Sequence, residues 1–337
     1  MMRNERAQTL VMVALMLVVL LDFLALVLDG GNLYLERRQM QTAADAGALA
    51  AAKAWCMSQA DWQSVGDAYC GRNASTGYTI TCNTGAGTAA PVRVTASEPV
   101  QTWFARILGS QFATVTVSAE AEATCNPVGS TGTLWPVAVM AGMPNCDATE
   151  IDGCFLTGSE NIYELWDKED NEYKKECEAD PLKPQCDDTS GAFGFLRWND
   201  SPCGLGGANL LKQSILSPNC ATGVTVPSTI YSEPGAELGS VKDEMATWCD
   251  QDVPVPLYRT RTEGGGQNTG YNIEAIGVFH LTGICTGRNK PQCPEQPAST
   301  CDSKASMVMG YFTGETIQGF GSPDAPDTGA YVVYLVR

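Results

Sequence analysis

Histidine is almost absent from the 337-residue sequence, which contains only His280. Any Ser-His-Asp or Cys-His catalytic arrangement would have to use this one residue, and the sequence has no G-x-S-x-G nucleophile elbow. His280 lies in the apolar run 277–283 (GVFHLTG), which is typical of a histidine packed within a strand. A single histidine also argues against mixed Cys/His zinc sites. We therefore expect no catalytic residue, no metal, no cofactor and no enzymatic activity.

Basic residues are few as well. The chain has 21 Lys and Arg against 38 Asp and Glu, for a formal net charge of −17. Affinity for nucleic acid depends on clustered Lys and Arg that neutralise phosphates, and the adjacent basic pairs Arg37-Arg38 and Lys174-Lys175 lie far apart in the sequence. We therefore expect no nucleic-acid partner. The acidic excess is typical of a solvated surface in an aqueous compartment.

Closely spaced cysteine pairs are also missing, although the chain has 14 cysteines. No two of them have the C-x-x-C spacing of a zinc ribbon or a thioredoxin-type redox site. Their even number and their position after the N-terminal apolar segment favour disulfides in an oxidising compartment. The spacing does not fix the connectivity. The candidates are Cys146 with Cys154 and Cys177 with Cys186 as loop staples, and the group Cys285, Cys293 and Cys301 with one outside partner.

The one long apolar run covers residues 7–28. At 1.5 Å rise per residue a helix of this length spans roughly 30 Å, the thickness of a bilayer core. A cleavable signal peptide is the alternative, but its apolar region is shorter and ends at a small-x-small site. Here the run ends in Asp29-Gly30-Gly31. We expect a retained transmembrane helix.

The orientation of this helix follows from charge. Arg3 and Arg6 precede the apolar run, and the acidic, cysteine-rich part of the chain follows it. The positive-inside rule then places residues 1–6 in the cytoplasm and the C-terminal part outside. The disulfides predict the same orientation independently. The expected location is the cell membrane, crossed once, with the C-terminal domain extracytoplasmic.

Asp22 lies in the outer third of this span. A carboxylate at that depth is costly and usually faces protein or water rather than lipid. Three alternatives are open: it pairs with Arg or Lys of a neighbouring subunit, it is protonated, or it is hydrated near the interface.

Residues 32–60 are rich in alanine and other strong helix formers, and they predict a helix that continues the anchor. Small residues recur at four-residue intervals and allow another backbone to approach closely. Both packing against the protein's own sheet and packing between helices of different subunits fit this pattern. The two lines of small residues are Ala43, Gly47 and Ala51, and Ala44, Ala48 and Ala52.

The string DGGNLYLERRQMQTAADAGALAAA, residues 29–52, follows an N-terminal Arg-x-Gln and the apolar span. Roughly residues 3–55 resemble the N-terminal domain of TadG-like proteins, in the TadE/TadG group of the Flp (tight-adherence) pilus assembly system. The positions that carry the motif are Asp29, Arg37, Arg38, Gln41 and Asp45.

This resemblance implies a non-catalytic bacterial envelope protein that is an assembly or minor structural component of a Flp pilus. Its partners would be the lipid bilayer and other pilus or envelope subunits, contacted through the N-terminal helix, among them other copies of the same chain. A membrane-tethered extracellular binding or adhesion module is the alternative.

The part of the chain expected outside the membrane divides into two regions, residues 29–125 and 126–337, which differ in sequence pattern and composition. In residues 29–125, runs that alternate apolar and polar residues at 77–83, 91–100 and 112–124 predict strands, and residues 102–108 predict a short helix. These elements predict a small α+β unit in which a sheet leans on the long helix, as in pilins.

Residues 126–337 are richer in Pro, Gly, Cys and acidic residues, and we expect them to form a disulfide-rich, mainly antiparallel β domain with helical insertions. The fold class expected for the whole chain is α+β. The predicted helices are residues 208–216 and 237–248, and the predicted strands are 134–140, 161–166, 193–198, 253–260, 271–281, 306–311 and 331–336.

Overall fold

The structure of the protein, a computed structural model, describes residues 4–73, 80–88, 90–109, 112–140, 163–164, 194–198, 203, 207–221, 223–233, 238–262, 269–301 and 306–336. The chain divides into two compact units. Unit 1 comprises Met1–Thr124 and Val333–Arg337, and unit 2 comprises Cys125–Val332. The division falls within strand β3 (Thr114–Thr131) and within strand β13 (Ala330–Val336). Each unit has a buried apolar core of its own.

Unit 1 is built on α1 (Asn4–Cys56), a single helix of 53 residues. It contains no proline, and its alanines and leucines are strong helix formers, so it continues unbroken through Gly30 and Gly31. It ends four residues before the predicted boundary, and Ser58 takes a positive φ of 53° in the turn that follows. A second helix, α2 (Trp62–Arg72), then packs against α1.

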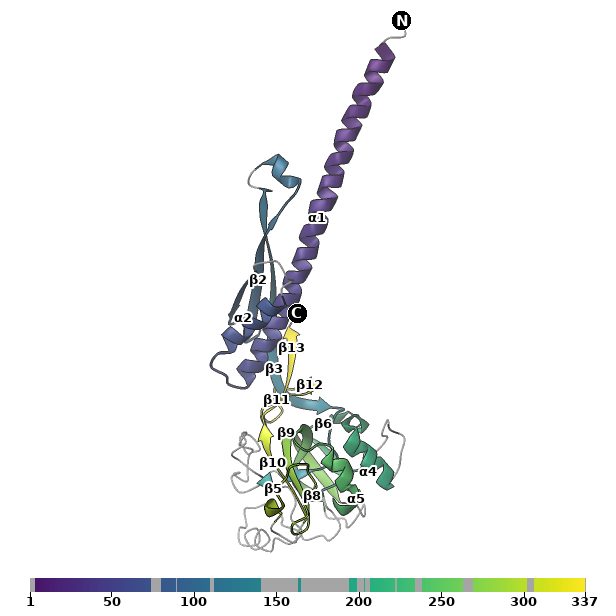
Figure 1. The fold of residues 1–337 in the computed structure, drawn as a ribbon, viewed down its shortest axis with the longest axis vertical. Coiled ribbons are helices and arrows are strands. Elements are labelled where there is room, and N and C mark those ends of the chain that lie inside the picture. Colours follow the sequence, from purple (N-terminus) through teal and green to yellow (C-terminus); the bar gives the residue numbers. More distant parts are fainter. Residues whose placement is uncertain are drawn as a thin grey trace. The chain divides into compact units, whose positions relative to one another are not determined.

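The sheet of unit 1 lies against these helices. Strands β1 (Thr81–Gly85), β2 (Val92–Gln101) and β3 pair antiparallel in that order, and β13 follows β3 in the strand order. The hairpin of β2 and β3 lies beside α1 (Figure 1). A disulfide between Cys70 and Cys82 joins α2 to β1.

Small side chains form most of the core of unit 1. The helix contributes alanines, and the facing sides of β2 and β3 contribute valines and alanines at every second position. Because alanine side chains are small, the backbones of the helix and the sheet can approach each other closely. The buried members on the strands are Val92, Val94, Ala96, Val100, Val117, Ala119, Ala121 and Ala123.

Unit 2 contains a six-stranded sheet in the order β4-β8-β9-β10-β5, with β7 paired to β9. The pairs β8–β9 and β9–β10 are antiparallel, and β4–β8 is parallel. The strands are β4 (Val139–Met140), β5 (Tyr163–Glu164), β7 (Ser228–Tyr231), β8 (Asp252–Thr262), β9 (Gly270–Thr286) and β10 (Ser306–Thr313). Shorter strands are β6 (Val224–Thr225), β11 (Glu315–Thr316) and β12 (Phe320–Gly321).

Helices α4 (Gly207–Leu216) and α5 (Leu238–Ala246) pack together in unit 2. The indole nitrogen of Trp248 donates a hydrogen bond to the carbonyl oxygen of Ile215 at 2.7 Å, which ties the end of one helix to the other. Large side chains fill the core beside them, unlike the alanines of unit 1. Its fully buried aromatic members are Trp135, Phe195, Phe279 and Phe312.

The disulfides of unit 2 crosslink its loops. Cys203 pairs with Cys220, Cys285 pairs with Cys301, and Cys249 pairs with Cys293. The last two bonds agree with the predicted group of three cysteines with one outside partner, which is Cys249. The other predicted staples lie outside the described residues, and they are Cys146, Cys154, Cys177 and Cys186.

The predicted α+β class is confirmed: a long apolar N-terminal helix precedes mixed α/β structure with antiparallel sheets, further helices and paired cysteines. Three local predictions are wrong in detail. The predicted strand 134–140 is a strand only at Val139–Met140. The predicted helix 102–108 is only the short 3₁₀ helix η1 (Ala105–Leu108). The predicted strand 193–198 contributes only isolated bridges, from Phe195 to Val137 and from Leu196 to Ser232.

Candidate functional site

The first part of α1, residues 9–28, is termed the apolar half. Every large apolar side chain from Leu10 to Leu28 is at least 50% exposed. The helix that contains these residues is long and apolar enough to cross a membrane, and its most apolar window is not buried at all. Soluble surfaces rarely expose a continuous apolar patch of this size, so the apolar half has the properties of a membrane anchor.

Asp22 is exposed on α1 within this half. Its neighbours along the helix, Leu21 and Phe23, are both more than half exposed. The pairing of Asp22 with another subunit therefore stays a prediction.

The second part of α1, residues 29–52, is termed the packed half, and it begins at Asp29. This carboxylate is 6% exposed and accepts three backbone N–H groups from the turn between β2 and β3. Its Oδ1 accepts from Trp103 at 2.9 Å, and its Oδ2 accepts from Phe104 at 3.0 Å and Ala105 at 2.6 Å. These N–H groups precede η1 or lie at its start, where a helix leaves donors unsatisfied. Asp29 thus fastens the hairpin to the helix where the apolar half ends.

The hydrogen bonds decide the protonation state of Asp29. Burial by itself raises the pKa of a carboxyl group, but the N–H donors of Ala105, Trp103 and Phe104, with a smaller contribution from the charge of Arg106, hold the pKa of Asp29 below its ordinary value of 3.8. The group is therefore ionised at neutral pH. Its family-motif position thus coincides with a structural contact.

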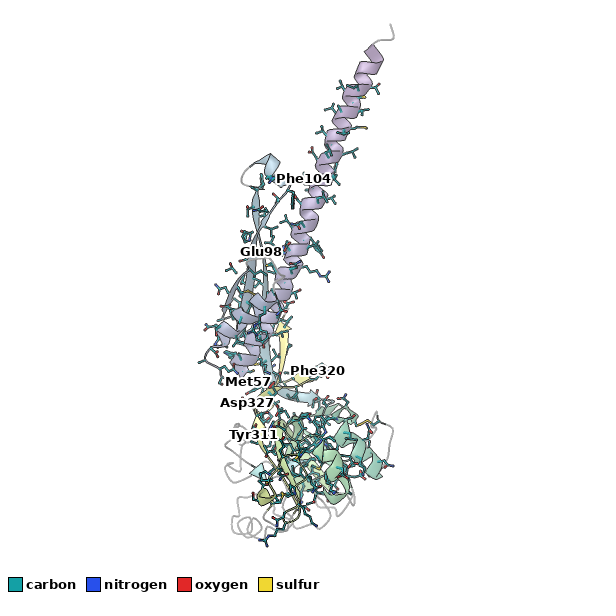
Figure 2. The ribbon with its side chains drawn as sticks, in the orientation of Figure 1. Met57, Glu98, Phe104, Tyr311, Phe320 and Asp327 are labelled. Carbon is teal, nitrogen blue, oxygen red and sulfur yellow. A yellow bond between two sulfur atoms is a disulfide. The ribbon has the colours of Figure 1, made fainter. Side chains whose placement is uncertain are left out.

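A second buried acid lies two turns further along the same face of α1. Glu36 and Glu98 of β2 are each 4% exposed, and the Oε2 atom of each has no hydrogen-bond partner. Burial, and then the negative charge of Glu36, raise the pKa of Glu98 above its ordinary value of 4.5. Figure 2 shows Glu98 on the hairpin that lies beside α1. Glu36 and Glu98 are thus the poorly satisfied acids of the interface between α1 and the hairpin.

The two lines of small residues lie in the core of unit 1. Five of them are fully buried, and a Cβ atom on Gly47 would lie 2.9 Å from the Cβ of Cys70 and 2.9 Å from the carbonyl oxygen of Gly66. The chain's own α2 and β2 therefore cover this face, as in the first of the two alternatives that the sequence left open. The five buried alanines are Ala43, Ala44, Ala48, Ala51 and Ala52.

The remaining motif residues lie at the side of the packed half. Arg37 and Arg38 are exposed. Gln41 donates from Nε2 to Asp45 Oδ1 at 2.7 Å and to the carbonyl oxygen of Glu120 at 3.3 Å. The second of these bonds joins α1 to β3. The structure therefore brings Gln41 and Asp45 together and leaves the two arginines on the surface.

In unit 2, His280 lies on β9 as predicted, with both ring nitrogens near carboxylates. Its Nδ1 is 2.7 Å from Asp252 Oδ1, its Nε2 is 3.3 Å from Asp250 Oδ1, and its ring stacks on Tyr311. Across the described part of the chain, no group of three or more His, Cys, Asp or Glu residues could hold a metal ion.

Sequence reasoning missed the exposed aromatic residues of the turn that Asp29 holds. Trp103, Phe104 and Phe112 are 69%, 38% and 44% exposed. A signal was present: between Glu98 and Glu120 the sequence has one charged residue, Arg106, in a chain of net charge −17.

Residues 7–54, which lie within α1, match the family model described as putative Flp pilus-assembly TadE/G-like. No curated protein and no solved structure gives a match to the chain. The family match confirms the resemblance drawn from the sequence and supports a role related to Flp pilus assembly. It suggests a role other than catalysis, and it implies contacts with other pilus or envelope components.

Proposed function

We propose that this chain is a non-catalytic, membrane-anchored assembly or minor structural component of a Flp/Tad-type pilus. One observation carries the proposal: the family match covers a single helix that contains both an exposed apolar half and a packed half. A helix of this kind joins a bilayer to a folded unit without a flexible linker. That property suits a subunit that must hold its outer part in a fixed place during assembly.

The proposed topology places the segment before the apolar half in the cytoplasm and both units outside. Arg3 and Arg6 support this orientation through the positive-inside rule. The disulfides of both units support it as well, because such bonds persist in oxidising compartments.

Removal of the chain tests the role in assembly. In a strain that lacks it, pili counted by electron microscopy should be lost or sharply reduced, and the full-length chain should restore them. Normal pilus numbers together with loss of attachment to surfaces would contradict the proposal and favour the adhesion module.

Protease digestion tests the topology. Protease added outside intact spheroplasts should degrade both units and leave a short membrane-protected fragment that contains the apolar half. Full protection of both units would contradict the proposed orientation, and complete release of the chain into the soluble fraction would contradict the anchor.

A further inference from the structure

The turn between β2 and β3, described at residues 102–109 and 112–113 and termed the hairpin turn, is closed by hydrogen bonds at its base and has exposed aromatic side chains. The backbone N–H of Thr102 donates to the carbonyl oxygen of Ala113 at 3.1 Å, and the Thr102 hydroxyl donates to the carbonyl oxygen of Phe112. Outside this closure Trp103, Phe104 and Phe112 remain open to solvent. The turn thus presents aromatic surface from a fixed backbone.

Asp29 places this surface at the end of the apolar half. Its three hydrogen bonds attach residues 103–105 to the helical turn that directly follows Leu28. Within Thr9–Leu28, all of which the structure describes, Ala25 is the one residue that is partly covered, and it lies one helical turn before Asp29 on the same face. Figure 2 shows Phe104 in the turn beside α1. If the apolar half spans a bilayer, the hairpin turn lies at the level of its outer interface.

The charge of this region suits an interface of phospholipid headgroups. Residues 99–119 contain Arg106 and no acid, although the whole chain has 38 acidic residues. Arg106 is exposed on η1. Trp is enriched at membrane–water interfaces, where its ring lies among the headgroups. Long basic side chains place their apolar stems along such a surface and their charge at the phosphates.

We propose that the hairpin turn is a second membrane contact, inserted at the headgroup–acyl boundary of the bilayer that the apolar half spans. Trp103, Phe104 and Phe112 enter this boundary, and Arg106 contacts lipid phosphates. The proposal rests on the anchor described under the proposed function. Two points of attachment on one rigid element fix the tilt and rotation of unit 1 against the membrane, which a single helix does not do.

The lipid bilayer is favoured over a second protein chain as the occupant for a positional reason. The turn is fixed beside the last turn of the apolar half, so lipid headgroups surround it as soon as that half is inserted. A protein partner would have to displace them. The hydrogen bonds of Asp29 also use backbone donors, which leaves the exposed side chains of Trp103 and Phe104 available for contact with lipid.

The test is photo-crosslinking of the full-length chain in vesicles of phosphatidylethanolamine and phosphatidylglycerol. A benzophenone amino acid replaces Trp103, Leu17 or Trp55 in three separate variants, and adducts are identified by mass spectrometry. Substitution of Trp103 keeps the N–H that Asp29 accepts. Leu17 reports the anchor, because it is 56% exposed in the apolar half. Trp55 is the matched control, an aromatic residue 43% exposed on the same helix but about 39 Å beyond Asp29 by helical rise.

The expected result is lipid adducts at positions 103 and 17 and none at 55. Protein adducts at 103, or no adduct there while Leu17 still captures lipid, would overturn the second contact and leave the anchor intact. Absence of lipid adducts at both 17 and 103 would overturn the anchor and the second contact together. Lipid adducts at 103 and 55 alike would show non-specific contact and would also overturn the proposal.

Arg106 gives a second readout in the same vesicles. With Arg106→Gln, the share of phosphatidylglycerol among the adducts at position 103 should fall by at least about twofold, because the cation attracts anionic lipid. Arg72→Gln is the control, since Arg72 is exposed at the end of α2 and stacks over Tyr69 in the same unit. An unchanged share in Arg106→Gln would contradict the role given to Arg106.

Discussion

The two halves of α1 share one continuous helix and differ in almost everything else. In the apolar half most side chains are large and exposed, such as Leu10 at 73%, whereas most of the fully buried side chains of the packed half are small, such as Ala48. Large apolar side chains suit lipid, which fills the space between them, and alanine suits a facing backbone that must come close. The size of the side chains therefore indicates whether lipid or protein is expected around each half, although both halves are equally helical.

Two buried acids lie between α1 and the hairpin, and their pKa values shift in opposite directions. Asp29 has hydrogen-bond donors for both oxygens, so its pKa is lowered. Glu98 is buried near Glu36 and its Oε2 has no donor, so its pKa is raised. One acid therefore stabilises the contact between helix and hairpin at neutral pH, and the other weakens it.

The largest effect is expected from overpacking the contact between the packed half and α2. Gly47→Ala should reduce the free energy of unfolding of unit 1 by about 1–3 kcal/mol, because overpacking forces the surrounding backbone to shift. The new Cβ would meet Cys70, which its disulfide to Cys82 holds in place. Hydrogen exchange of the β2 amides measures this loss in unit 1 by itself.

The matched control for this prediction is Gly31→Ala on the same helix. Nothing lies within 4 Å of a Cβ at position 31, so this change should leave the exchange of β2 unchanged and favour the helix by about 0.5–1 kcal/mol. Equal exchange in the two variants would contradict the contrast between the crowded and the open positions.

The next effect is expected at Asp29. Asp29→Asn keeps an oxygen acceptor at only one of the two carboxylate positions and places an NH₂ donor against the N–H groups at the other, so amide exchange at residues 103–105 should accelerate about tenfold. In the unmodified chain the contribution of Asp29 is present above pH 3.8 and is lost as the pH falls through its lowered folded-state pKa. Exchange measured by mass spectrometry at pH 7 checks the substitution. Unchanged protection of these amides in Asp29→Asn would contradict the attachment of the turn.

The smallest effect has the opposite sign. Glu98→Gln should stabilise unit 1 by about 1 kcal/mol at pH 7, because it removes a buried carboxylate near Glu36 whose Oε2 has no hydrogen-bond donor. The folded-state pKa of Glu98 is raised, so the folded chain binds more protons than the unfolded chain between pH 4.5 and that raised value. The unmodified protein therefore loses stability as the pH rises through this window, and the advantage of the variant should vanish below pH 4.5.

Glu120→Gln serves as the control for this effect. Glu120 is on β3, about half exposed, and its Oε1 lies 2.7 Å from Nε of Arg93. Its removal should give no gain in stability at pH 7. Stabilisation by both substitutions would show a general effect of net charge rather than the contact between Glu36 and Glu98.

Much of the fold was predictable because it depends on local patterns. The apolar run predicted the anchor, alternation of apolar and polar residues predicted a strand close to β2, and strand-like runs predicted strands close to β8 and β9. The alternation of apolar and polar residues does not, however, identify which strand pairs with which. Residues 331–336 were predicted as a strand, but nothing in them indicates that residues 333–337 belong to unit 1. Cys249 could not be identified as the partner of Cys293 for the same reason, since 44 residues separate them.

The candidate site was less predictable because it depends on distant contacts. The stripe of small residues around Gly47 is compatible with close packing against the backbone of any neighbouring element. Only the tertiary structure shows that the neighbouring elements are α2 and β2. Asp29 was recognised through the family motif, without any sign of the N–H groups that it accepts. Glu36 and Glu98 are 62 positions apart in the sequence, so their proximity follows from the packing of β2 on α1 alone.

Labelling with a lipid-soluble diazirine tests the contrast between the two halves most directly. The full-length chain in native membranes is irradiated with this probe, and modified residues along α1 are mapped by mass spectrometry. We predict strong labelling from Leu10 to Leu28, an abrupt end at Asp29, and no labelling from Met40 to Ala52. Labelling that continues through Ala48, or that is missing from the apolar half, would contradict the account of one helix in two environments.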